Sequence, residues 1–109
     1  MSFQEIDSVE TFEECINQPL VLIDFYAKWC GPCKSMIPKL DQLMVRSDKI
    51  KQNLKAYKVD IDELPEIADK YNIKSLPTFI TFEGGLIFDI VNGANYEQLV
   101  KMVDELVDV

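Results

Sequence analysis

Two cysteines, Cys30 and Cys33, have only a glycine and a proline between them, and this spacing admits three kinds of chemistry. Such a pair can bind a metal, close a structural disulfide or exchange electrons with another disulfide. A structural zinc site needs a second pair or histidines, whereas this chain has no histidine and one distant cysteine, Cys15. A disulfide across two residues closes a loop too small to constrain the unfolded chain much. The pair therefore favours redox chemistry, and a metal-linked dimer stays open as an alternative.

The residues that follow Cys30 predict that the cysteine pair lies at the start of a helix. Pro32 suits the first helical turn, where its missing N–H is harmless, and Met36 and Leu40 continue with helical spacing. Unpaired backbone N–H groups and the positive end of the helix dipole stabilise a thiolate at Cys30, the reactive form of the thiol. Cys33 follows one turn later, less exposed, and can attack a sulfur atom bonded to Cys30. The spacing predicts one attacking and one resolving thiol.

One acid interrupts the apolar run VLIDFY at residues 21–26. A continuous apolar run of this length predicts a central strand that is covered on both faces. Burial would raise the pKa of the Asp24 carboxyl, so that it could exchange a proton near neutral pH. The alternative is a solvated aspartate at the end of a strand.

Composition narrows the function further. The chain has 109 residues, which suits one domain, and a formal charge of −8, which disfavours binding to nucleic acid or to an anionic membrane. The lack of histidine excludes Cys–His and Ser–His–Asp catalytic sites. Residues 1–10 carry no basic and apolar signal pattern, so we expect a cytoplasmic protein.

The remaining pattern predicts one α/β domain with a mixed central sheet and helices on both faces. Residues 45–53 are charged and are interpreted as a helix end and a turn, and a glycine-rich turn predicts a hairpin near residue 84. The expected strands cover residues 2–6, 20–27, 54–62, 77–83 and 86–93. The expected helices cover residues 7–18, 32–44, 63–72 and 96–109, with Ser8 as the first N-cap.

The segment DFYAKWCGPCK, residues 24–34, resembles the active-site segment of the thioredoxin family. Further matches follow in the family's order over the whole chain: Pro38 in the active-site helix, KVDID in the third strand, LPTF before the fourth and NGA after the fifth. The resemblance implies the thioredoxin fold for residues 1–109, a single three-layer α/β/α domain with about five strands and about four helices.

The resemblance also implies a role for individual residues. Cys30 would be the nucleophile, Cys33 the resolving cysteine and Asp24 the buried carboxylate behind Cys33. Lys58 would be the partner of Asp24, although an exposed strand lysine is the alternative. Pro77 would be a cis-proline facing the cysteines. The uncharged substrate-binding surface would comprise Trp29, Gly31, Pro32, Ile61, Leu76, Gly93 and Ala94.

The sequence departs from the family's common pattern at a few positions. Tyr26 stands where many members carry tryptophan, and Asn92 stands where an apolar residue is often seen. Cys15 lies outside the motif, and its neighbours Phe12 and Ile16 favour a buried, inert thiol over a regulatory or dimer-forming one.

The resemblance implies a monomeric protein-disulfide reductase without bound cofactor or metal. A flavin-containing thioredoxin reductase fed by NADPH would return the protein to the dithiol form, and disulfide-containing proteins such as peroxiredoxins would be its targets. The Gly31–Pro32 turn and the absence of histidine favour a reductant over an oxidant or isomerase of the same fold. A binding subunit of this fold, in which the cysteines are incidental, is the alternative from another class.

Overall fold

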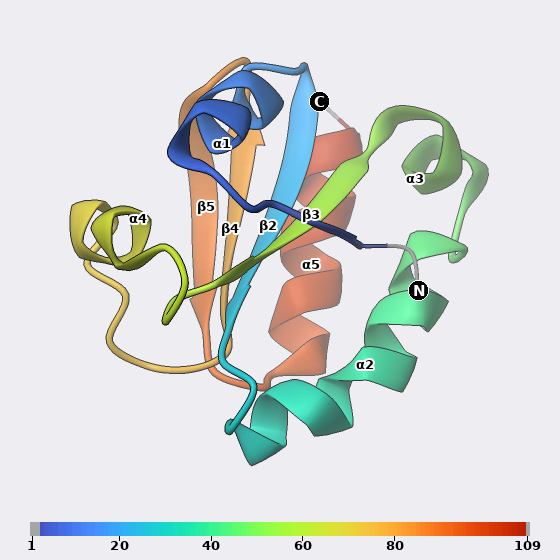
Figure 1. The fold of residues 1–109 in the computed structure, drawn as a ribbon. Coiled ribbons are helices and arrows are strands. Elements are labelled where there is room, and N and C mark those ends of the chain that lie inside the picture. The colour runs from blue at the N-terminus through green and yellow to red at the C-terminus, as the bar shows by residue number, and fades with distance from the viewer. Residues whose placement is uncertain (1–2, 109) are drawn as a thin grey trace.

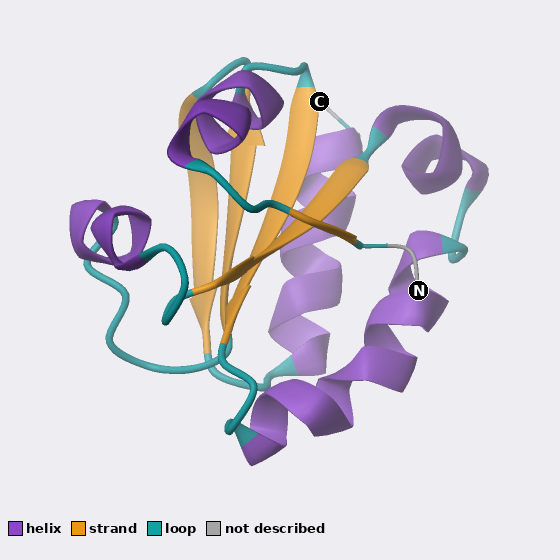
Figure 2. Cartoon of the chain, in the orientation of Figure 1, coloured by secondary structure: helices purple, strands orange, loops and turns teal. Residues whose placement is uncertain are grey.

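A five-stranded mixed sheet lies between two layers of helices in the computed structural model, which describes residues 3–108 (Figures 1 and 2). The strands are β1 (Gln4–Glu5), β2 (Leu20–Tyr26), β3 (Lys55–Asp60), β4 (Thr78–Glu83) and β5 (Leu86–Asn92). The helices are α1 (Val9–Ile16), α2 (Gly31–Met44), α3 (Asp48–Asn53), α4 (Pro65–Lys70) and α5 (Tyr96–Val107). The outer ends of the first predicted strand and the last predicted helix, residues 2 and 109, lie outside the described residues.

The strand order β1-β3-β2-β4-β5 places β2 at the centre of the sheet. β3 pairs in parallel with β1 and β2, whereas β4 pairs antiparallel with β2 and β5. The β4–β5 hairpin turns at Gly84 and Gly85, whose φ angles of 57° and 90° suit glycine. The three-layer α/β architecture with a mixed sheet is therefore confirmed.

Two hydrophobic clusters hold the layers together. One cluster joins the sheet to α2, α3 and α5, and the other joins it to α1 and α4. Side chains of β2 enter both clusters, because successive residues of a strand point to opposite faces. A strand so covered explains the continuous apolar run in the sequence. No helix within residues 3–108 has both the length and the apolarity needed to span a membrane.

A short helix, α3, occupies part of the segment that was interpreted as a helix end and a turn. Ser47 caps it, since its Oγ accepts a hydrogen bond from the Ile50 N–H at 3.2 Å. Ile50 is fully buried and anchors the helix against the core. The described chain thus has five helices rather than about four. The charged residues around this single apolar anchor hid the helix in the sequence.

A ring cluster beneath α1 yields a stability prediction. Phe12 is fully buried, and its ring centroid lies 5.6 Å from that of Tyr71. We expect Phe12→Ala to lower the free energy of unfolding by about 3–5 kcal/mol, because it removes a large side chain from a packed core. The control Leu86→Ala, at an exposed position, should change it by less than about 0.5 kcal/mol. Urea denaturation measures both, and equal losses would contradict this account of the core.

Candidate active site

The Cys30–Cys33 pair forms a disulfide at the start of α2, after the short loop that follows β2. Cys30 is the N-cap of α2, and its Sγ accepts a hydrogen bond from the Cys33 N–H at 3.2 Å. Pro32 lies in the first turn, where no donor is lost. The predicted placement at a helix start is confirmed. When the disulfide opens, this N–H and the helix dipole stabilise a thiolate at Cys30.

The two cysteines line different spaces. Cys30 borders a surface groove of about 340 Å³ together with Trp29 and Leu76. Cys33 borders a separate pocket of about 230 Å³ together with Asp24. Cys30 is 5% exposed and Cys33 is 6% exposed in the disulfide form. The predicted lower exposure of Cys33 is therefore wrong for this form. What distinguishes them is the space that each one faces.

Asp24 lies in the middle of β2 and is only 5% exposed. Its Oδ1 has no hydrogen-bond partner among residues 3–108. Burial raises the pKa of its carboxyl to about 7, against a lowering by Lys58 and a further rise from Glu5. The alternative of a solvated aspartate is wrong, and the group can change its protonation near neutral pH.

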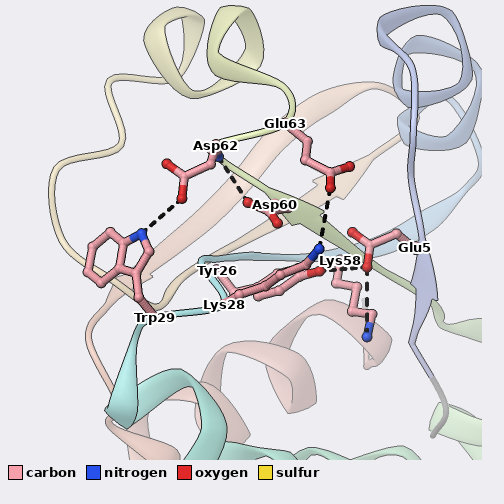
Figure 3. Close-up of polar contacts among 8 residues, drawn as sticks. All are labelled: Glu5, Tyr26, Lys28, Trp29, Lys58, Asp60, Asp62 and Glu63. Atoms are coloured by element: carbon pink, nitrogen blue, oxygen red, sulfur yellow. Dashed lines mark hydrogen bonds and ion pairs between the residues drawn. The ribbon is translucent and has the colours of Figure 1, made fainter.

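Lys58 lies opposite Asp24 in the register of β2 and β3, and both residues line the pocket beside Cys33. Its Nζ pairs with Glu5 Oε1 at 3.8 Å (Figure 3). The ammonium group also lies 5.5 Å from the centroid of the Tyr26 ring. Lys58 thus acts on Asp24 through its charge, while its ion pair is made with Glu5. The alternative of an ordinary exposed strand lysine does not describe it, because its side chain is mostly buried.

The groove beside Cys30 gathers most of the predicted substrate-binding residues. Trp29 is 69% exposed, and its Nε1 donates a hydrogen bond to Asp62 Oδ2 at 2.8 Å (Figure 3). Lys74 also lines the groove, so this surface is not wholly uncharged as predicted. The predicted residues that line it are Trp29, Gly31, Pro32, Ile61 and Leu76.

Three predicted residues lie outside the groove. Pro77 follows Leu76 in the chain, and Gly93, followed by Ala94, is hydrogen-bonded to Pro77. The Leu76–Pro77 peptide bond is cis, and Leu76 packs against the cluster of Ala27, Cys30 and Cys33. The Gly93 N–H donates a hydrogen bond to the Pro77 carbonyl at 2.7 Å. Ala94 follows Gly93 and is exposed. These two residues do not line the groove itself.

Comparison with known proteins agrees with this geometry. The family model described as Thioredoxin matches residues 4–105. The chain belongs to the thioredoxin family. Its architecture is the thioredoxin fold: a structure solved for the thiol-resolving mechanism of yeast mitochondrial 1-Cys peroxiredoxin matches with a TM-score of 0.86 at 31% identity, over 95% of each chain.

Two curated thioredoxins illustrate the range of relatives. Thioredoxin 1 of Plasmodium falciparum is 36% identical over 101 residues, which cover 92% of this chain and 93% of that protein. Thioredoxin Y2, chloroplastic, of Arabidopsis thaliana is 41% identical over 107 residues, which cover 97% of this chain and 62% of that protein. The chain spans 53–62% of the length of several curated relatives that it matches.

Sequence reasoning missed three contacts of this thioredoxin-family site. No role was predicted for Glu5 or Asp62, and none for Tyr26 beyond its place where many family members carry tryptophan. An acid in the short first strand was visible, but its position beside Lys58 depends on strand register. Cys15 is unpaired and partly buried against the cluster that contains Phe12 and Ile16, so its predicted burial is confirmed in part. Within residues 3–108 no group of three or more His, Cys, Asp and Glu side chains could hold a metal ion.

The raised pKa of Asp24 makes stability depend on pH. The folded state binds this proton up to about pH 7, whereas the unfolded state loses it near pH 3.8, so stability falls as the pH rises between these values. We expect Asp24→Asn to raise the free energy of unfolding at pH 8 by roughly 4 kcal/mol, and the gain should shrink as the pH falls toward 4.

Urea denaturation at several pH values measures this gain. Asp69→Asn, at an exposed position of α4, is the matched control for the loss of one acid. A gain that is independent of pH would contradict the burial of an ionised Asp24.

Proposed function

We propose that the chain is a protein-disulfide reductase that works by dithiol–disulfide exchange. The observation that carries this proposal is the division between Cys30, which lines the surface groove, and Cys33, which lines the pocket that contains Asp24. A target disulfide that enters the groove meets Cys30 first. The proton acceptor then lies on the side of the second thiol.

The proposed reaction starts from the dithiol form. The Cys30 thiolate attacks one sulfur of a target disulfide, forms a mixed disulfide and releases one target thiolate. The Asp24 carboxylate accepts the proton of the Cys33 thiol. The Cys33 thiolate attacks the Cys30 sulfur and releases the second target thiolate. Both target sulfurs gain protons, and the Cys30–Cys33 disulfide carries away the oxidising equivalents.

Recycling requires two electrons from another protein. A flavin-containing thioredoxin reductase fed by NADPH is the proposed donor, because the residues between the cysteines are those of the reducing branch of the family. Neither Gly31 nor Pro32 can place a positive charge beside the thiolate, which a histidine there would do in an oxidant. The protein itself then needs no bound cofactor, and it would contribute to redox homeostasis as a monomer.

Substrates are proposed to be disulfides of other proteins, with peroxiredoxins as one class. A similar structure was solved in the context of a yeast mitochondrial 1-Cys peroxiredoxin, which supports that class. We propose broad rather than sequence-specific recognition, because the exposed Trp29 ring offers apolar contact and Lys74 is the one charged residue that lines the groove among the described residues.

The proposed location is the cytoplasm. The chain has three cysteines and so lacks the dense cysteine framework of many small secreted proteins, which supports a compartment that keeps thiols reduced. We expect a fluorescent fusion at the C-terminus of the full-length protein to distribute with a cytoplasmic marker. Coincidence with a chloroplast or mitochondrial marker would overturn the location and leave the chemistry untouched.

A binding module is the second candidate function, and the exposure of Trp29 beside the groove is the observation that favours it. Such a module would hold a partner through this apolar surface. It would not need either thiol, so cysteine variants separate the two functions.

Insulin disulfide reduction tests the reductase. We expect Cys30→Ser to abolish turnover with dithiothreitol or with NADPH and a thioredoxin reductase, because no other thiol lies at the groove. We expect Cys33→Ser to accumulate a mixed disulfide through Cys30, which mass spectrometry detects, because the resolving thiol is lost.

Cys15→Ser is the matched control, and it should retain the turnover of the unmodified protein. If the unmodified protein reduces no insulin while its fold is intact, the reductase proposal fails. Binding of partners that survives in Cys30→Ser/Cys33→Ser would then support the module.

A further inference from the structure

A row of three charged residues crosses the sheet beside the active site. Glu5 on β1 is in register with Lys58 on β3, and Lys58 is in register with Asp24 on β2. Residues in register on neighbouring parallel strands point to the same face of a sheet. Lys58 therefore lies between two acids, one on the edge strand and one on the central strand.

The ammonium group of Lys58 is held at the Glu5 end of this row. Its Nζ lies 3.8 Å from Glu5 Oε1, and the Tyr26 hydroxyl donates a hydrogen bond to the same oxygen at 2.6 Å (Figure 3). The Tyr26 ring centroid lies 5.5 Å from Nζ, a favourable position for a cation over an aromatic face. Glu5 and Tyr26 together bind the lysine.

Asp24 is left without a direct partner at the other end of the row. Its Oδ1 makes no hydrogen bond within residues 3–108, although Lys58 lines the same pocket of about 230 Å³. A lysine has a flexible four-carbon stem, so a change at Glu5 would let the ammonium group turn toward Asp24. An opposite charge at closer range favours the ionised carboxylate.

We propose that Glu5 is a positioning residue that, with Tyr26, holds Lys58 away from Asp24 and so lets Asp24 exchange a proton near neutral pH. This inference rests on the proposed role of Asp24 as the proton acceptor of Cys33. Glu5 does not touch the reacting sulfur atoms. It acts through Lys58.

The titratable and charged groups around Asp24 come from every neighbouring element except β4, which places Phe79 in register with it. Lys58 lies on β3 and Glu5 on β1. The others that line the pocket with Asp24 are Tyr26 of β2, Lys28 of the following loop, and Cys33 and Lys34 of α2. Of these groups, Lys58 and Glu5 are the ones whose charge acts on the pKa of Asp24.

Titration of the Asp24 carboxyl by ¹³C NMR, on the disulfide form, tests the proposal directly. We expect the pKa of Asp24, about 7 in the unmodified protein, to fall to about 6 in Glu5→Gln, because the charge of Glu5 is lost and the released Lys58 moves closer. Gln has nearly the size of Glu and Glu5 is partly exposed, so the fold should persist. An unchanged pKa of Asp24 in the folded variant would overturn the proposal.

Glu13→Gln is the matched control. Glu13 is a comparably exposed acid that pairs with Lys70 at 3.3 Å, away from the pocket that contains Asp24. It removes the same charge from the chain and should leave the pKa of Asp24 at about 7. An equal fall in both variants would mean that only net charge matters, and the proposal would be wrong.

A double variant asks whether Glu5 acts through Lys58. In a Lys58→Met background, Glu5→Gln has no ammonium group to release, so its effect on the pKa of Asp24 should be much smaller than in the unmodified background. An effect of equal size would assign Glu5 a direct field effect and overturn its positioning role.

The pH dependence of mixed-disulfide resolution distinguishes a failure of the positioning role of Glu5 from a failure of the proposed reductase function. In Glu5→Gln the pH midpoint for resolution of the mixed disulfide should move down together with the pKa of Asp24, by about one pH unit. If the unmodified protein shows no insulin reduction, the proposed function fails while the NMR result still decides the position of Lys58. If the pKa of Asp24 falls but the pH midpoint does not, Asp24 is not the proton acceptor and the inference fails with it.

Discussion

The burial of one carboxylate in the central strand is the constraint on which the site depends. β2 has paired neighbours on both sides and hydrophobic clusters on both faces, so Asp24 has almost no access to water. An ionised group in such a place costs free energy unless it is paired, and the raised pKa of Asp24 expresses that cost. The chain keeps this unfavourable group where an apolar residue would pack better, which fits a part in proton transfer.

The same strand determines how the two thiols differ. The C-terminal end of β2 leads into a short loop, after which α2 begins with Cys30 as its N-cap. The helix terminus can stabilise a negative charge at the first sulfur, which lines the groove. The second sulfur belongs to Cys33, which lines the pocket that contains the buried acid. Two chemically identical side chains thus lie in different surroundings because of the direction in which strand and helix meet, which supports the proposed roles of an attacking and a resolving thiol.

Local signals in the sequence sufficed to predict much of the candidate active site. An apolar run with one acid predicted a buried Asp24, and proline after the first cysteine predicted the start of α2, because both depend on neighbours in the chain. Strand register and packing could not be predicted. The pairing of Glu5 with Lys58 joins strands more than fifty positions apart, and the contact between Trp29 and Asp62 joins two loops. The helix α3 was missed because a single buried residue, Ile50, anchors it.

A gradient of exposure explains why Lys58 pairs with the outer of its two acids. The Glu5 side chain is 40% exposed, whereas Asp24 is 5% exposed. While Glu5 is ionised, an ammonium group that moved next to Asp24 would give up its ion pair with Glu5 and some hydration in exchange for one new attraction. Without the charge of Glu5, only the loss of hydration opposes that move. The partly exposed ion pair of Lys58 with Glu5 adds little stability by itself. The ion pair instead affects the buried Asp24, because a distant positive charge lowers the pKa of its carboxyl less than an adjacent one would. In the proposed arrangement, an edge-strand residue sets the acidity of a carboxyl group that it never touches.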